Sequence, residues 1–211
     1  MQLTTPPVGF WLHDNVPDDL VKHLWTCIGQ QQENVKHELA GHISQSYSIP
    51  DTNSKFTKYL LAIAQEYYKA NEGHPHQDTL IRKGREWVIK LDKFWVNYQK
   101  KHEFQPLHSH TGMYSFVVWM KIPYNCKEEN EYEFMQDVKK DERNAGCFCF
   151  TYTDLLGRIK NAVYEIDQDM ENTILFFPAG LKHQVYPFFT SNEERVSISG
   201  NLSIDFNKKH E

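Results

Sequence analysis

The sequence is poor in cysteine and has no long apolar run, and both shortages exclude classes of protein. Four cysteines in 211 residues are too few for a disulfide-dense secreted scaffold. Cys147 and Cys149 share one face of a predicted strand but are poorly placed to bond each other, so we expect reduced thiols in a cytoplasm. No segment approaches the ~18 apolar residues of a membrane span, and the first residues do not form a signal peptide.

Positive charge is also scarce. The chain has 23 lysines and arginines against 28 aspartates and glutamates, which gives a formal net charge of −5. No broad basic field can attract nucleic acid, so we expect neither nucleic-acid nor membrane partners. Aromatic residues, in contrast, are plentiful, and 13 phenylalanines, 11 tyrosines and 5 tryptophans favour β-structure with a large core. Eleven histidines make metal ligation worth considering.

The chain shows two different sequence patterns, one in its first third and one in the remainder. In the first third, apolar residues at helical spacing predict one helix over residues 17–30 and a second from a cap at Asn53 or Ser54 to about residue 71. The remainder consists of short aromatic and β-branched runs bounded by turn residues, which is typical of a sandwich or barrel. We therefore predict a single α+β domain.

Within this domain, a mainly helical N-terminal layer (1–80) is predicted to pack on a jelly-roll, or double-stranded β-helix, core (81–211). A linker around residues 71–80 is the candidate boundary, although the core does not divide there. The polar stretch 127–145 is predicted to be a long exposed connection.

His108 and His110 are the strongest candidates for metal ligands. Residues i and i+2 of an extended chain point to the same face, so both imidazoles can reach one cation. An HxH pattern alone is common by chance, and an ordinary structural role stays open. A third imidazole, His183, follows an apolar strand and a Pro-Ala-Gly turn. Three nitrogens from two strands can form a facial triad that leaves coordination positions open.

Arg195 and Ser197 form a second candidate group, shortly after His183. The two side chains share one face of an alternating strand. An arginine fork beside a hydroxyl is a good receptor for a carboxylate, because the guanidinium donates two parallel hydrogen bonds. The alternative is a surface ion pair between Arg195 and Glu193 or Glu194.

Three blocks of the sequence, FxPxHxHxG, FFPxxxxHxVxPF and ERxSISGN, resemble those of the Fe(II)/2-oxoglutarate-dependent dioxygenases in the same order. The pattern is most similar to short members from tailed viruses of cyanobacteria, and it covers residues 92–204. The resemblance implies a jelly-roll enzyme that uses Fe(II), 2-oxoglutarate and O2 to oxidise a small-molecule or protein substrate.

The resemblance also implies roles for individual residues. His108 and His183 would be iron ligands, and Arg195 with Ser197 would bind the C5 carboxylate of 2-oxoglutarate. Tyr98 stands where prolyl hydroxylases often have a tyrosine that reaches the same carboxylate.

The sequence departs from the family at His110, where an aspartate or glutamate is expected. His110 is either the third ligand, as in the three-histidine site of thiol dioxygenases, or part of an HxG-type site. Related halogenases bind chloride at the missing carboxylate position of such a site. His108 and His110 stand at the positions expected for the ligands relative to the segment FQP before them and SFVVW after them, which favours the first interpretation. A neutral triad leaves the iron one negative charge short, which weakens Fe(II) retention.

Two other classes of protein compete with the enzyme. A cupin-like jelly roll that binds a metal or a carbohydrate without turnover uses the same histidines but does not require Arg195 and Ser197. A phage structural or adhesion protein is disfavoured by the absence of repeats. We expect the enzyme in the cytoplasm, that of the host if the protein is viral. No pattern predicts the substrate or the oligomeric state.

Overall fold

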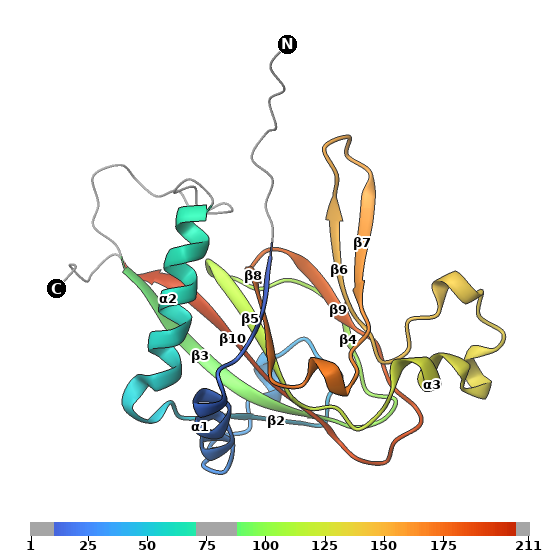
Figure 1. Cartoon of the computed structure of the whole chain (residues 1–211), viewed down its shortest axis with the longest axis horizontal. Coiled ribbons are helices and arrows are strands. Elements are labelled where there is room, and N and C mark those ends of the chain that lie inside the picture. The colour runs from blue at the N-terminus through green and yellow to red at the C-terminus, as the bar shows by residue number, and fades with distance from the viewer. Residues whose placement is uncertain (1–10, 71–87, 206–211) are drawn as a thin grey trace.

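The computed structural model describes residues 11–70 and 88–205, which form an α+β fold (Figure 1). The predicted linker around residues 71–80 lies outside the described residues. The helices of the described ranges are α1 (Asp18–Ile28), α2 (Lys55–Ala70) and α3 (Cys126–Glu131). The strands are β1 (Leu12–Asn15), β2 (Gln45–Ser48), β3 (Val88–Gln99), β4 (Gln105–His108), β5 (Tyr114–Lys121), β6 (Phe148–Thr153), β7 (Ile159–Tyr164), β8 (Thr173–Pro178), β9 (Lys182–Val185) and β10 (Arg195–Asp205).

The strands form two antiparallel sheets, in the jelly-roll arrangement that the sequence predicts. The large sheet has the order β1-β8-β5-β10-β3-β2, and the small sheet has the order β4-β9-β6-β7. The first 80 residues contribute more than the predicted helices, because β1 pairs with β8 and β2 pairs with β3 at the two edges of the large sheet. Both edge strands are only four residues long.

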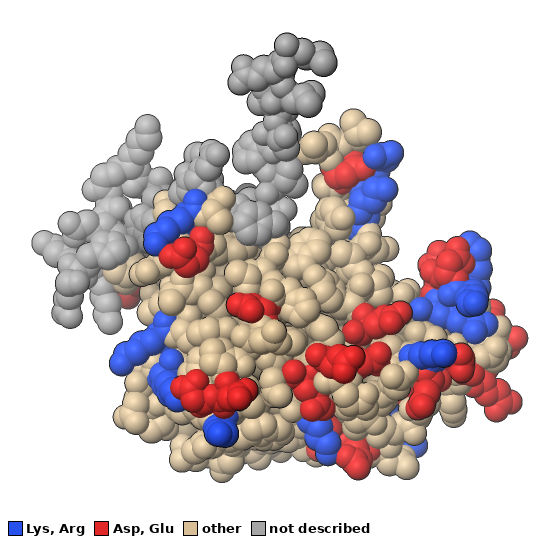
Figure 2. Space-filling model, in the orientation of Figure 1, with Lys and Arg blue, Asp and Glu red and all other residues tan. Residues whose placement is uncertain are grey.

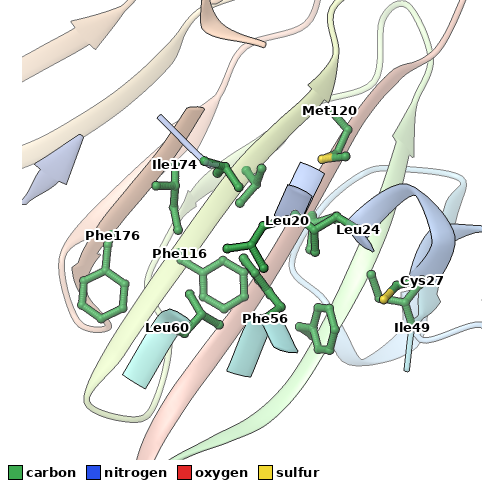
Figure 3. Packing of buried hydrophobic residues seen from close by; sticks show 14 of the residues in the cluster. Leu20, Leu24, Cys27, Ile49, Phe56, Leu60, Phe116, Met120, Ile174 and Phe176 are labelled. Carbon is green, nitrogen blue, oxygen red and sulfur yellow. The ribbon is translucent and has the colours of Figure 1, made fainter. Parts of the chain in front are cut away.

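The helices α1 and α2 cover one face of the large sheet (Figure 1). Their apolar residues recur at helical spacing and therefore lie on one side of each helix. Figure 3 shows this packing, with Leu20 and Leu24 from α1 and Phe56 and Leu60 from α2 near Phe116 of β5. Burial of such a side chain contributes about 1.5–3 kcal/mol. Because the helices occupy this face, only the opposite face of the large sheet can border an internal site.

Both predicted helices are present, but the N-terminal cap of α2 differs from the prediction. Asp51, rather than Asn53 or Ser54, accepts hydrogen bonds from the backbone N–H groups of Phe56 (3.1 Å) and Thr57 (2.7 Å). Asn53 and Ser54 have left-handed backbones, with φ of 62° and 53°. They turn the chain ahead of the helix, which brings Asp51 over the first turn.

The polar stretch 127–145, predicted as a long exposed connection with its order left open, is an ordered connection. It contains most of α3 and two short 3-10 turns. Glu129 in α3 is fully buried and accepts hydrogen bonds from the backbone N–H groups of Phe189 (2.6 Å) and Thr190 (3.0 Å). These bonds fix the connection to the loop that precedes β10.

In the described ranges, the helices are too short or too polar to cross a membrane. Figure 2 shows acidic and basic side chains interspersed over the described part of one face. This part carries no continuous basic surface of the kind that nucleic-acid binding requires.

Candidate active site

The three histidines singled out in the sequence lie together. His108 in β4 is directly opposite His183 in β9, and their ring centroids are 4.3 Å apart. The ring of His110, just beyond β4, is 5.0 Å from that of His108 and 5.1 Å from that of His183. One potential ligand nitrogen of each residue lies within 4.8 Å of the other two. The group can therefore hold a metal ion.

Backbone carbonyls orient two of the imidazoles. Nδ1 of His108 lies 2.7 Å from the carbonyl oxygen of Pro106, and Nδ1 of His183 lies 2.9 Å from that of Leu181. A carbonyl oxygen only accepts hydrogen bonds, so each Nδ1 carries the proton and donates it. The Nε2 atom of each ring is left with a free lone pair, which is the tautomer that a metal needs.

Burial keeps these imidazoles neutral. Desolvation, aided by the neighbouring imidazoles, lowers the pKa of His183 to about 3 and the pKa of His110 to about 4. Desolvation also lowers the pKa of His108. The surroundings of His183 are apolar, since Phe148 stacks on its ring at 5.6 Å and Phe177 meets it edge-on at 4.9 Å. Neutral imidazole is the form that binds a metal, so the group needs to release no proton at neutral pH.

The metal-free protein is expected to lose stability when the pH falls from about 6.5 towards 4. Unfolded imidazoles take up protons near pKa 6.5, whereas His110 and His183 in the folded protein do so only at about 4 and 3. The unfolded state therefore binds more protons in this window, and the free energy of unfolding decreases as the pH falls. Denaturant unfolding at several pH values measures how steeply the free energy of unfolding changes with pH, and this slope should be shallower for His183→Ala. Equal slopes in the two proteins would contradict the burial assigned to His183.

A cavity of about 620 Å³ between the two sheets joins the imidazoles to Arg195. Its wall includes five of the six site residues predicted from the sequence, namely His108, His110, His183, Arg195 and Ser197. The cavity has the size of an ordinary small-molecule site.

Arg195 is a buried cation whose described partners are all neutral. It is only 2% exposed, and its guanidinium donates hydrogen bonds to the hydroxyl of Tyr124, the carbonyl of Gly146 (3.2 Å) and the side-chain carbonyl of Gln99. Among the described residues, Arg195 takes part in no ion pair, and Glu193, its surface alternative, pairs with a lysine. A buried charge without a counter-ion is costly, so the cavity is suited to an anion.

The structure does not bring Tyr98, the sixth predicted residue, to the cavity. Tyr98 lies opposite Val196 in the pairing of β3 with β10, and both pack against the cluster under the helices. The hydroxyl of Tyr98 donates to the side chain of Gln31 at 3.0 Å. Gln99, one residue later, lies opposite Arg195 and faces the cavity.

Two residues that hold Arg195, Tyr124 and Gln99, are not among those predicted from the sequence. The hydroxyl of Tyr124 accepts from Arg195 and donates to the carbonyl of Gly146 at 2.8 Å. Burial raises the pKa of Tyr124, so its hydroxyl keeps its proton. Tyr124 follows β5 in an irregular segment, where no alternation assigns a side chain to a face. Gln99 could have been found, since it shares its strand face with Asn97.

A second group of potential ligands, His23, Cys27 and Asp51, lies between α1 and α2. Nε2 of His23 is 2.8 Å from Oδ1 of Asp51 and 3.5 Å from Sγ of Cys27. Both carboxylate oxygens of Asp51 already accept hydrogen bonds from the start of α2. We therefore interpret this group as a structural link between the two helices.

The fold and the cavity define the class as jelly-roll proteins with a potential metal site beside a buried arginine. Within this class, residues 93–201 match the family model described as "Putative 2OG-Fe(II) oxygenase". The match spans more than half of the chain, and the chain belongs to this family. Membership implies Fe(II) and 2-oxoglutarate as metal and cosubstrate, and the three imidazoles and the buried arginine fit these two groups.

Solved structures with the same fold include a prolyl-4-hydroxylase from Pseudomonas putida, with 14% identity, a TM-score of 0.52 and coverage of 92% of both chains. The viral collagen prolyl hydroxylase of Paramecium Bursaria Chlorella virus-1, solved with 2OG, is 10% identical, with a TM-score of 0.47 and coverage of 91% of this chain and 94% of that one. At 14% identity the similarity to the Pseudomonas putida protein concerns the fold alone. No curated protein has a matching sequence.

Proposed function

We propose that this protein couples the oxidative decarboxylation of 2-oxoglutarate by O2 to the oxidation, in its simplest form hydroxylation, of a second substrate. One observation carries the proposal. Three neutral imidazoles and a buried arginine, which has no counter-ion among the described residues, line the same cavity. The first group suits a divalent cation and the second suits a carboxylate, which are the two requirements of this chemistry.

In the proposed site, His108, His110 and His183 hold Fe(II), and Arg195 and Ser197 bind the distal carboxylate of 2-oxoglutarate. Fe(II), when bound, supplies the redox chemistry with O2 that amino-acid side chains cannot supply. The protein orients the cosubstrate through the arginine and excludes water with the aromatic residues around His183. Tyr98 has no role in this site, because it faces the helical layer.

The second substrate in this proposal is a small molecule or a protein segment that reaches the cavity, and nucleic acid has no part in it. A cytoplasmic location is supported by the four cysteines, all of which are free and buried. The similarity to viral members of the family stays a prediction from the sequence.

Reconstituted protein is expected to convert 2-oxoglutarate and O2 to succinate and CO2 in the presence of Fe(II), with the other oxygen atom of O2 transferred to the second substrate. When the second substrate is absent, the conversion is slow and needs an added two-electron reductant such as ascorbate, which reduces that oxygen atom to water. Succinate should not form under nitrogen or in the His183→Ala protein. The alternative, a non-catalytic cupin-like protein, predicts metal binding without succinate. Stoichiometric metal and cosubstrate binding with no succinate after prolonged aerobic incubation would favour that alternative.

A separate prediction concerns His110. Its ring lies close enough to those of His108 and His183 for all three to bind one metal ion. His110→Ala is expected to lower Fe(II) affinity at least about tenfold, since loss of even a residue that orients a ligand costs about 10–100-fold. His110→Asp should keep the metal, because a carboxylate restores one negative charge at the same position.

Anaerobic Fe(II) titrations of both variants, with and without chloride, measure these effects. Chloride should matter little in the wild type if His110 is a ligand. The HxG-type interpretation predicts the reverse, namely a silent His110→Ala substitution and cosubstrate binding that chloride strengthens. A silent His110→Ala would contradict the three-histidine site.

A further inference from the structure

The inner face of the large sheet is polar where it borders the cavity, although it lies between two sheets. Ser46 and Asn97 are each only 1% exposed. Hydroxyl and amide side chains continue across the neighbouring strand β10 at Ser197, Ser199 and Asn201. Buried polar groups destabilise a protein unless they have hydrogen-bond partners, so the partners of these side chains are informative.

Two serine–asparagine pairs occur on this face. Ser46 Oγ donates to Oδ1 of Asn97 at 2.7 Å, and Ser115 Oγ donates to Oδ1 of Asn201 at 2.7 Å. The amide oxygen of Asn97 is thereby occupied, and its Nδ2 group is directed away from Ser46. The described partner of Nδ2 is Ser199 Oγ at 3.5 Å, a long contact that can use one of the two N–H groups. At least one N–H of Asn97 remains for a ligand.

The strand register places this N–H group between the imidazoles and Arg195. Asn97 lies opposite Ser197 in the pairing of β3 with β10, and the next inward position on β10 towards its start is Arg195. Two residues earlier on β3, Trp95 lies beside His110, with ring centroids 6.4 Å apart. Asn97 therefore borders the part of the cavity that a molecule joining the metal site to Arg195 must occupy.

The hydrogen bonds of Arg195 show that it cannot satisfy a carboxylate alone. A guanidinium has five N–H groups, and Tyr124, Gly146 and Gln99 use three of those of Arg195. Two remain, whereas an ionised carboxylate has about four acceptor sites. The hydroxyl of Ser197 and the free N–H of Asn97 supply the two donors that are lacking.

We propose that Asn97, held by Ser46, donates a hydrogen bond to the distal carboxylate of 2-oxoglutarate beside Arg195 and Ser197. The inference rests on the proposed function and adds to it a binding residue on β3 and a supporting residue on β2. The edge strand that the N-terminal layer contributes thus takes part in cosubstrate recognition.

The test is an anaerobic titration of the Fe(II)-loaded protein with 2-oxoglutarate, followed by the charge-transfer absorption that forms on binding. Asn97→Ala should raise the Kd about 10- to 100-fold, the effect of a hydrogen bond to a charged group. Ser46→Ala should raise the Kd less, since Asn97 is present but no longer fixed. Asn201→Ala is the matched control, because Asn201 forms the same kind of pair further from Arg195, and its Kd should stay within about twofold of the wild type.

The 2-oxo acid 2-oxobutyrate, which lacks the distal carboxylate, identifies the end of the molecule that Asn97 contacts. With this probe the difference between Asn97→Ala and the wild type should vanish. An unchanged Kd for 2-oxoglutarate in Asn97→Ala, an equal loss with 2-oxobutyrate, or an equal loss in Asn201→Ala would each overturn the inference. Arg195→Met distinguishes failure of the inference from failure of the proposed function. If only the inference is wrong, Arg195→Met still raises the Kd for 2-oxoglutarate. If the proposed function is wrong, Arg195→Met leaves the Kd unchanged as well.

Discussion

Replacing His183 by alanine is expected to abolish stoichiometric Fe(II) binding while the protein stays folded. The substitution removes one of three imidazoles, from the residue that is most buried of the three and whose Nδ1 donates to a backbone carbonyl, which leaves Nε2 free for a metal. Some loss of stability accompanies it, on the order of 1–3 kcal/mol, because the ring packs between Phe148 and Phe177 and leaves a void.

Equilibrium dialysis of Fe(II) under nitrogen measures the effect, and near-ultraviolet circular dichroism shows whether the variant is folded. His42→Ala is the matched control, because His42 stacks on Phe104 beside the same part of the fold but is not in the wall of the large cavity. The control should bind iron as the wild type does. A folded His183→Ala protein with one equivalent of tightly bound iron would show that the site assignment is wrong.

Replacing Arg195 by methionine is expected to weaken 2-oxoglutarate binding by roughly 2–5 kcal/mol, the effect of removing one partner of a desolvated charge pair. Methionine fills much of the volume between Tyr124 and Phe188, over whose rings the guanidinium lies at 5.7 and 5.9 Å. Fe(II) affinity should change little, because Arg195 is not a ligand. The melting temperature should fall only modestly, because the loss of the three hydrogen bonds of Arg195 is offset by the removal of a buried cation that has no counter-ion among the described residues.

Calorimetric titration of the two ligands in turn separates these effects. Arg158→Met, which removes an exposed arginine paired with Asp154, is the control for a general loss of positive charge. Loss of Fe(II) and 2-oxoglutarate binding to the same extent, together with a large fall in the melting temperature, would assign Arg195 a structural role instead.

The sequence predicts the site best where short-range geometry decides it. His108 and His110 share a face because they are two residues apart in an extended segment, and Ser197 shares a face with Arg195 for the same reason. His183 is a candidate from its place after an apolar strand and a Pro-Ala-Gly turn, and the resemblance to a family supports it, but neither specifies which residue it contacts. Its contact with His108 depends on the pairing of β4 with β9, and no local pattern specifies which distant strands pair.

Tyr98 shows the opposite case. The resemblance to prolyl hydroxylases predicts that Tyr98 contacts the cosubstrate, whereas the alternation of side chains along β3 places it on the other face. Phe94, Val96 and Tyr98 alternate on one face of β3, whereas Asn97 and Gln99 face the cavity. Tyr98 is four residues after Phe94, so the two side chains point to the same, helix-covered face of the strand, away from the cosubstrate.

The two edge strands and Tyr124 could not be predicted for another reason. β1 and β2 are too short to show an alternating pattern, and their pairing depends on long-range contacts with the core. Tyr124 reaches Arg195 from an irregular segment, so its position depends on the packing of the whole large sheet. Local propensity carries no information on such contacts.

The central claim is that one cavity binds Fe(II) and 2-oxoglutarate together, and an anaerobic spectroscopic titration tests it most directly. The metal-free protein is titrated first with Fe(II) and then with 2-oxoglutarate. The account predicts a metal-to-ligand charge-transfer band that appears only when both are present, saturates at one equivalent of iron, is absent in His183→Ala and needs far more 2-oxoglutarate in Arg195→Met. Tight binding of iron with no such band at saturating 2-oxoglutarate would contradict the account.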